Sequence, residues 1–222
     1  RFYMEKGAEV IVVDDLSRKG AGKNLEWLKT LGNITFYRQD IRDGKSLERT
    51  LRECGDIDLV LHMAAQVAVT TSVQDPRTDL EINALGTFNL LEAVRASGCS
   101  PAVIFASTNK VYGEMTDVGV EREGRRYRFA TLPGGVPESR QLDFHSPYGC
   151  SKGCADQYVI DYSRIYGLRT VCMRQSCIYG PRQFGVEDQG WVAHFTIAAA
   201  TGRPVTIYGD GMQVRDILHV KD

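Results

Sequence analysis

Short apolar runs alternate along the chain with longer segments whose apolar positions recur every three or four residues. The short runs are rich in β-branched side chains and predict strands, whereas the longer segments have the periodicity of helices. The predicted strands are residues 8–15, 34–40, 58–65, 102–107 and 169–176. The predicted helices are roughly residues 22–31, 44–53, 76–97, 148–166 and 189–201.

The order of these elements predicts the fold class. Near-continuous apolar strands separated by helices are typical of a parallel sheet that is covered on both faces. We therefore predict an α/β chain with a doubly wound parallel sheet, a Rossmann-type fold. Residues 1–175 are assigned to this domain. Residues 176–222, where the periodicity becomes irregular, are assigned to an incomplete, smaller substrate-binding region.

One long segment does not fit the alternation. Residues 114–146 are polar and are interrupted by Gly and Pro, so we expect an excursion loop there. Loops of that length in compact domains are usually functional or mobile.

The first predicted strand ends on an acid, Asp14, in "EVIVVDDLS". In dinucleotide-binding folds such an acid follows a glycine fingerprint by about 20 residues and binds the adenine ribose. Counting back from Asp14 passes the start of the chain, so we expect a glycine loop and a first strand upstream of these residues. The segment 1–10 then corresponds to the end of the first helix, and these 222 residues alone are expected to show little or no activity.

Composition narrows the possible functions. The 222 residues are 43% hydrophobic and 25% charged, which is enough for one sizeable core. With 27 basic and 28 acidic residues, electrostatics give no reason to expect a nucleic-acid partner. No apolar run approaches the roughly 20 residues that span a bilayer, and the first ten residues are not a signal peptide. We expect a cytoplasmic protein without membrane association.

The six cysteines show no C-x-x-C spacing, and the four histidines do not cluster. Neither a zinc site nor a redox motif is indicated, so we expect reduced thiols and no metal.

Tyr148 and Lys152 are four residues apart in "HSPYGCSKGCADQY", where a helix is predicted. Residues at this spacing are neighbours on a helix surface. A shift of roughly three units in the pKa of a tyrosine, from near 10, requires about 4 kcal/mol, which an adjacent cation in a poorly hydrated site supplies. Such a tyrosine exchanges protons with a substrate hydroxyl at neutral pH. The spacing alone also arises by chance, so its context decides.

Taken together, the motifs resemble those of the extended short-chain dehydrogenase/reductase superfamily, and within it the nucleotide-sugar epimerases. The resemblance covers essentially the whole chain. The motifs follow the order and approximate spacing of that family: "VVDDLSRKG", "QDIRD", "HMAAQVAV", "EINALGTFNLLEAV", "FASTNKVYGE", "SPYGCSKG" and "QVRDILHVKD".

The resemblance implies NAD as the cofactor and three catalytic residues. Thr108 would orient the reacting sugar hydroxyl, Tyr148 would act as base and acid, and Lys152 would lower the pKa of Tyr148 and bind the nicotinamide ribose. The implied cofactor contacts are Asp14, Asp40, Ile41, Ala64, Ala65, Gln66, Asn83, Tyr148 and Lys152. Asp14 favours NAD because its carboxylate would repel a 2′-phosphate. For Asp40, capping of the following helix is an equally good interpretation.

The resemblance also implies a nucleotide-diphosphate sugar as substrate. Its implied contacts are Thr108, Ser176, Cys177, Arg182, Gln189 and Arg215. Arg215, in "QVRD", would bind the pyrophosphate with its planar guanidinium group. Family members often pair through helices such as 76–97 and 148–166, so a homo-oligomer is expected.

The reaction implied is an epimerisation: NAD⁺ removes a hydride from a sugar carbon, the keto-sugar is repositioned, and the hydride returns to the opposite face. Sugar-nucleotide 4,6-dehydratases carry Asp-Glu after the threonine, whereas this chain has Asn109 and Lys110, which favours epimerisation. The greatest resemblance is to the 2-epimerases that convert CDP-paratose to CDP-tyvelose. Two alternatives stay open: a UDP-sugar 4-epimerase or related enzyme, and a non-catalytic dinucleotide-binding scaffold.

Overall fold

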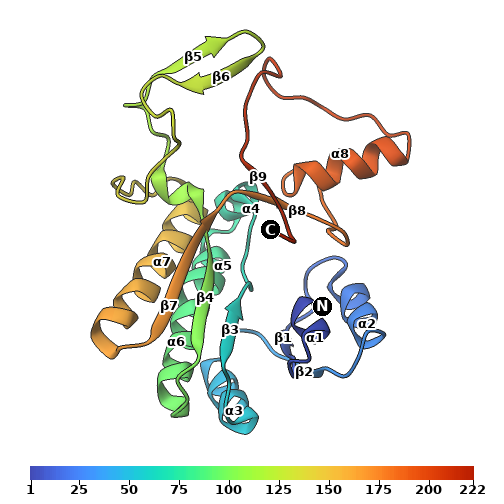
Figure 1. Ribbon diagram of the computed structural model, residues 1–222, viewed down its shortest axis with the longest axis vertical. Coiled ribbons are helices and arrows are strands. Elements are labelled where there is room, and N and C mark those ends of the chain that lie inside the picture. Colours follow the sequence, from blue (N-terminus) through green and yellow to red (C-terminus); the bar gives the residue numbers. More distant parts are fainter.

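The computed structural model describes residues 1–222, and its core is built from parallel strands with helices between them (Figure 1). Strand β1 (Ile11–Asp14) pairs with β2 (Thr35–Arg38). Strand β4 (Ala102–Thr108) lies between β3 (Leu59–His62) and β7 (Arg169–Gln175). All of these pairs are parallel. The five strands predicted from the sequence are therefore confirmed, and they form two hydrogen-bonded groups.

Helices occupy the segments between these strands, and all five predicted helices are present. The predicted helix 76–97 consists of three consecutive pieces, the middle one a π-helix, and a short helix that was not predicted precedes it. The bounds are α1 (Phe2–Glu5), α2 (Ala21–Lys29), α3 (Gly44–Cys54), α4 (Val69–Gln74), α5 (Pro76–Leu80), η1 (Glu81–Leu85), α6 (Gly86–Ser97), the 3₁₀ turn η2 (Asn109–Tyr112), α7 (Ser146–Tyr166) and α8 (Trp191–Ala200). None of them combines the length and apolar character that a membrane crossing requires.

The core lies on one face of the β3–β4–β7 sheet. Val103 and Phe105, which share a face of β4, are fully buried against α3, α6 and α7. On the opposite face Leu61, Val171 and Met173 are exposed. Helices α3, α6 and α7 all pack on the Val103 and Phe105 side of these three strands (Figure 1).

The excursion predicted for residues 114–146 contains an unpredicted antiparallel hairpin. Its strands are β5 (Val120–Glu123) and β6 (Arg126–Phe129), and in Figure 1 it projects from the top of the molecule. A second unpredicted pair is formed by the short parallel strands β8 (Cys177–Tyr179) and β9 (Ile217–His219). This pair brings the last residues of the chain beside the segment that follows β7.

Helix α7 is built so that its first two turns pack tightly against neighbouring segments. Pro147 occupies the first turn, where its missing N–H costs nothing, and Gly167 ends the helix at φ 71°. Gly153 leaves room for the Phe144 ring, which would lie 2.3 Å from a Cβ at that position. The small residues around Tyr148 and Lys152 thus permit close packing where both side chains are needed.

Candidate active site

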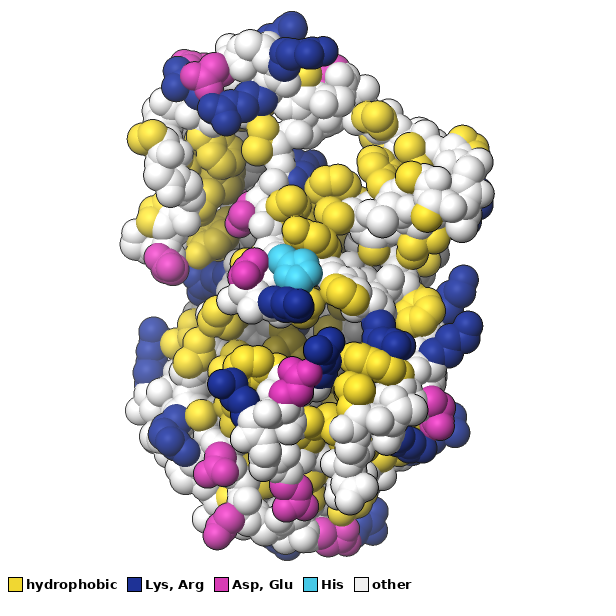
Figure 2. Space-filling view, turned by 45° about the vertical axis from the view of Figure 1, so that its right-hand side comes forward, with side chains coloured by type: hydrophobic (Ala, Val, Ile, Leu, Met, Phe, Trp, Pro, Cys, Tyr) yellow, Lys and Arg dark blue, Asp and Glu magenta, His cyan; other side chains and the backbone are white.

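The carboxyl ends of β4 and β7 open into a cavity of about 840 Å³. Thr108, at the end of β4, lines it together with Tyr148 and Lys152 from α7. Figure 2 shows a face of the molecule that is hollowed at its middle, with apolar side chains and several Lys and Arg side chains around the hollow. The sequence prediction that these three residues share one site is therefore consistent with their placement.

Each of the three side chains is buried. The Thr108 hydroxyl accepts a hydrogen bond from the Lys110 amide at 3.3 Å, which caps η2, and it lies near enough to the Tyr148 hydroxyl to lower the pKa of Tyr148. The Lys152 ammonium donates to the Ala106 carbonyl at 2.6 Å and lies 4.0 Å from the centre of the Phe105 ring. Lys152 is therefore held by the β4 backbone.

Burial dominates the electrostatics of this group. It raises the pKa of Tyr148, an effect that the Thr108 hydrogen bond opposes and the Asp79 charge reinforces. Burial also lowers the pKa of Lys152 to about 8, against the opposing influence of Asp156, Cys172 and Asp79. The sequence analysis expected Lys152 to lower the pKa of Tyr148. In this structure the pKa is raised, because burial outweighs the stabilising contacts and the ammonium group is directed at Ala106.

A second cavity, of about 500 Å³, adjoins the first at the ends of β1 and β2. Ala65, Arg182 and Gln189 line both cavities, so the two share part of their walls. The second cavity is lined by five of the residues expected to bind the cofactor: Asp14, Asp40, Ile41, Ala64 and Ala65.

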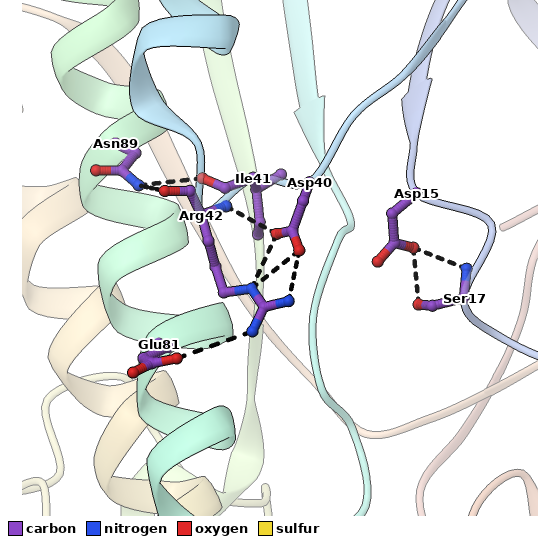
Figure 3. A network of polar contacts seen from close by, with 7 residues as sticks. All are labelled: Asp15, Ser17, Asp40, Ile41, Arg42, Glu81 and Asn89. Carbon is purple, nitrogen blue, oxygen red and sulfur yellow. Dashed lines mark hydrogen bonds and ion pairs between the residues drawn. The ribbon is translucent and has the colours of Figure 1, made fainter.

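Charged groups at the entrance to this cavity are ordered by local contacts, as Figure 3 shows. Asp40 pairs with Arg42 through its guanidinium group at 2.6 Å, and this contact lowers the pKa of the Asp40 carboxyl. Arg42 also lies 3.8 Å from Glu81, at the start of the π-helix. Asp43, and not Asp40, caps the following helix by accepting from the Ser46 amide. The capping interpretation of Asp40 is therefore wrong.

Gln66 and Asn83, also expected to bind the cofactor, lie behind the cavity walls. The side-chain oxygen of Asn83 accepts from the backbone N–H of Gln66 at 3.0 Å, and its side-chain nitrogen donates to the backbone carbonyl of Gln66 at 3.1 Å. This reciprocal pair fixes the loop after β3, which carries Ala64 and Ala65 into the second cavity. In this structure the side chains of Gln66 and Asn83 support the cavity wall and do not form its surface.

The residues expected to bind substrate all line the larger cavity: Thr108, Ser176, Cys177, Arg182, Gln189 and Arg215. Several already have protein partners. The Arg182 guanidinium lies 3.8 Å from the centre of the Trp27 ring, and Gln189 accepts a hydrogen bond from Arg18. The Arg215 side chain is exposed, and its one hydrogen bond is to the neighbouring Val214 carbonyl, so it is free to engage a ligand.

A buried ion pair beside the site was missed. Arg174 on β7 donates to both oxygens of Asp156 on α7, at 2.9 and 3.0 Å, and Ser107 donates to the same carboxylate at 2.6 Å. Burial alone would raise the pKa of Asp156, but these hydrogen bonds outweigh it and the pKa is lowered. The only signal in the sequence was that Asp156 lies one helical turn after Lys152 and so faces the same side of the helix; nothing local pointed to Arg174.

Cavities at the carboxyl ends of parallel strands, one beside a strand-end carboxylate and one with a Thr, Tyr and Lys set, define the class: a Rossmann-type dinucleotide-binding protein. Comparison with known proteins agrees. The model of the NAD dependent epimerase/dehydratase family matches residues 1–222. The chain belongs to that family.

Individual relatives refine the comparison. CDP-paratose 2-epimerase of Salmonella typhi is 49% identical over 100% of this chain and 67% of its own length. The crystal structure of UDP-glucose 4-epimerase with UDP-glucose from Thermotoga maritima superposes with a TM-score of 0.80 at 35% identity, over 99% of this chain and 64% of that one. That of Thermus thermophilus UDP-glucose 4-epimerase in complex with NAD gives a TM-score of 0.77 at 34% identity, over 99% and 65%. The chain thus spans about two thirds of the length of these proteins.

Proposed function

We propose that this protein is an NAD-dependent nucleotide-sugar epimerase that converts CDP-paratose to CDP-tyvelose by inversion at C2. The observation that carries the proposal is the grouping of Thr108, Tyr148 and Lys152 on one wall of the cavity at the carboxyl end of β4. The relative with 49% identity over the whole chain is a CDP-paratose 2-epimerase, which supports the choice of substrate.

The residues present fit NAD. The smaller cavity begins at Asp14, whose carboxylate suits ribose hydroxyls, and it adjoins the cavity that contains Tyr148 and Lys152. Asp14, Asp40, Ile41, Ala64 and Ala65 would hold the adenosine half, while Tyr148 and Lys152 would meet the nicotinamide half. The chemistry that bound NAD⁺ would supply here is reversible hydride transfer at a sugar carbon.

The chain's own residues move the proton. Tyr148 is proposed to take the proton of the sugar hydroxyl as the hydride leaves and to return it when the hydride comes back. Because the pKa of Tyr148 is raised in this structure, this role requires the positive charge of the bound nicotinamide to lower that pKa. Thr108, adjacent to the Tyr148 hydroxyl, holds the reacting oxygen in line. Lys152 places a buried positive charge beside Tyr148, and Arg215, which also lines the cavity, is proposed to bind the pyrophosphate. Residues 176–222 would thus form part of the substrate-binding region.

A neutral residue and a basic residue follow Thr108, at the positions where elimination of water from the sugar would need two acids. Asn109 and Lys110 both line the cavity, and Asn109 lies 3.5 Å from the Ser176 hydroxyl. Neither side chain offers a carboxyl group to act as acid or base at a second sugar carbon. Epimerisation is therefore favoured over dehydration at this site.

The proposal is tested by incubating the full-length protein with NAD⁺ and CDP-paratose and identifying the product by NMR. Formation of CDP-tyvelose is expected. In Tyr148→Phe we expect turnover to fall by at least about 10²-fold with NAD⁺ still bound. Inversion of UDP-glucose at C4, which the two structural relatives favour, would replace the proposal with a 4-epimerase. Retained NAD⁺ binding with no turnover of either sugar would favour the scaffold.

The proposal includes a cytoplasmic homo-oligomer. Helices α6 and α7 lie side by side and carry a joint aromatic surface, in which the Phe88 and Tyr158 ring centres are 5.8 Å apart. Leu85, at the end of η1, and Ile165 and Tyr166 on α7 are also exposed. A second copy of the chain would cover this surface in a symmetric pair.

A further inference from the structure

Asp79, on α5, is an almost fully buried acid that no step proposed so far uses. Its residue is 1% exposed, and no Lys, Arg or His lies within ion-pair distance of it. Its carboxylate instead accepts three side-chain hydrogen bonds. Burying a carboxylate costs free energy unless its oxygens accept hydrogen bonds, and both oxygens of Asp79 do so.

One oxygen of Asp79 holds the wall of the dinucleotide cavity. Asp79 Oδ1 accepts from Gln66 Nε2 at 2.8 Å and from Asn83 Nδ2 at 3.1 Å. These are the two residues whose reciprocal bonds fix the loop after β3. Asp79 therefore orients both amide groups, so that each can form its bonds to the backbone of that loop.

The other oxygen reaches the catalytic helix. Asp79 Oδ2 accepts from the hydroxyl of Ser151, which lies on α7 between Tyr148 and Lys152. The same hydroxyl is 3.2 Å from the Tyr148 carbonyl and accepts from Asn83 Nδ2 at 3.1 Å. The Tyr148 amide donates to Ser72 on α4 at 3.1 Å. The backbone of Tyr148 is thus anchored to the helices that precede the π-helix.

The π-helix η1 makes this arrangement possible. Asp79, Asn83 and Thr87 are spaced four apart, across α5, η1 and α6, and all three are buried at 1% exposure. Single π-turns within α-helices are rare and frequently mark functional sites. Thr87 donates to the Asn83 carbonyl at 2.6 Å and lies 2.8 Å from His62 Nε2, so the polar stripe continues to the end of β3.

We propose that Asp79 is a positioning residue that couples two parts of the epimerase site: through Gln66 and Asn83 it holds the dinucleotide wall, and through Ser151 it fixes the helical turn that carries Tyr148. This inference rests on the proposed function for its turnover readout. Its first readout, NAD⁺ affinity, does not depend on the identity of the sugar.

The test compares three variants of the full-length protein by NAD⁺ calorimetry and by steady-state kinetics with CDP-paratose. Asp79→Leu removes all three acceptor contacts, and we expect NAD⁺ affinity to fall at least tenfold and kcat more steeply, with KM for the sugar within about twofold of wild type. Asp79→Asn keeps an acceptor for Gln66 and Asn83 and donates to Ser151, so both quantities are expected within about threefold of wild type. Ser151→Ala removes only the hydrogen bond between Asp79 and α7, and it should lower kcat while NAD⁺ affinity is retained.

Asp75→Leu is the matched control, because Asp75 is an exposed acid that caps the same helix by accepting from the Thr78 amide. It is expected to leave both NAD⁺ affinity and kcat near wild type. If Asp79→Leu does not fold, Ser151→Ala and Asp79→Asn carry the test. Wild-type NAD⁺ affinity in Asp79→Leu, failure of Asp79→Asn to restore it, or unchanged kcat in Ser151→Ala would overturn the proposal. Absent turnover of CDP-paratose by wild type would count against the proposed function and leave the affinity result standing.

Discussion

Lys152 lies in the cavity wall with its ammonium group buried, and burial determines its charge more than any one neighbour does. Its pKa is lowered to about 8 from an ordinary value of 10.5. In the unfolded chain the ammonium keeps its proton to higher pH. Between about pH 8 and 10.5 the unfolded state therefore binds more protons than the folded state, and the free energy of unfolding rises with pH.

Lys152→Met removes this titration while preserving the length of the side chain. We expect the stability of wild type relative to Lys152→Met to increase by about 2–3 kcal/mol between pH 7.5 and pH 10, because the cost of the buried charge disappears as the amine loses its proton. Urea unfolding of both proteins at each pH measures the difference, in which other titrating groups cancel. Parallel stability curves would show that the ammonium is well solvated in the folded state. Turnover is expected to be lost in the variant.

At the scale of elements, the Arg174–Asp156 pair joins β7 to α7, and Ser107 adds β4 to the same contact. Asp156 lies one turn after Lys152, so this contact fixes how the helix that carries Tyr148 and Lys152 sits on the sheet. The Asp156 side chain is fully buried and that of Arg174 is 15% exposed, which makes the pair unlike the exposed ion pairs elsewhere on the chain.

Arg174→Met should therefore destabilise the protein by about 3–5 kcal/mol, because it leaves the Asp156 carboxylate buried without its partner. The double variant Arg174→Met/Asp156→Leu should recover most of this loss, since no charge then needs compensation. Arg52→Met, which breaks the exposed Arg52–Glu48 pair, is the matched control and should cost less than about 1 kcal/mol. Urea unfolding measures all three. Equal losses in the single and double variants would contradict the argument.

The accuracy of the sequence prediction followed how much each element buries. The parallel strands and long helices were found because one side of each is apolar, as in β4, where Val103 and Phe105 alternate with less buried residues. The hairpin was missed because none of the four residues of β5 is buried, so its sequence carries no alternation. Strands β8 and β9 have three residues each and pair across about 40 positions, so neither has a local pattern.

The same limit applies to the site. Thr108, Tyr148 and Lys152 were predicted from spacing and resemblance, and the structure places all three around one cavity. Asp79 was missed because a single acid in a helical segment has the pattern of a surface charge until the contacts with Gln66 and Ser151 are known. The burial that raises the pKa of Tyr148 could not be predicted from the sequence either, because it depends on segments that are far apart in the chain.

At the scale of the whole molecule, topology brings the site together from distant segments. Residues of β1, the loop after β3, the end of β4, helix α7 and the segment after β8 line the two cavities. Tyr148 and Lys152 lie near the N-terminal end of α7, while the exposed Tyr158 and Tyr166 lie further along the same helix. Pairing of two copies through α6 and α7 would therefore stabilise the helix that carries Tyr148 and Lys152 without covering the cavity.

If two copies pair through α6 and α7, placing charged residues on the exposed face of α7 should weaken the dimer. Tyr158 and Ile165 are seven residues apart on one face of α7 and are 44% and 66% exposed. In a symmetric pair each substitution acts twice, so Tyr158→Glu/Ile165→Glu should raise the dimer dissociation constant at least tenfold. Light scattering after size-exclusion chromatography measures it. Val120→Glu places the same charge on an apolar residue of the hairpin that is 59% exposed, and it should leave the dimer intact. A wild-type protein that is monomeric at micromolar concentration would exclude this interface.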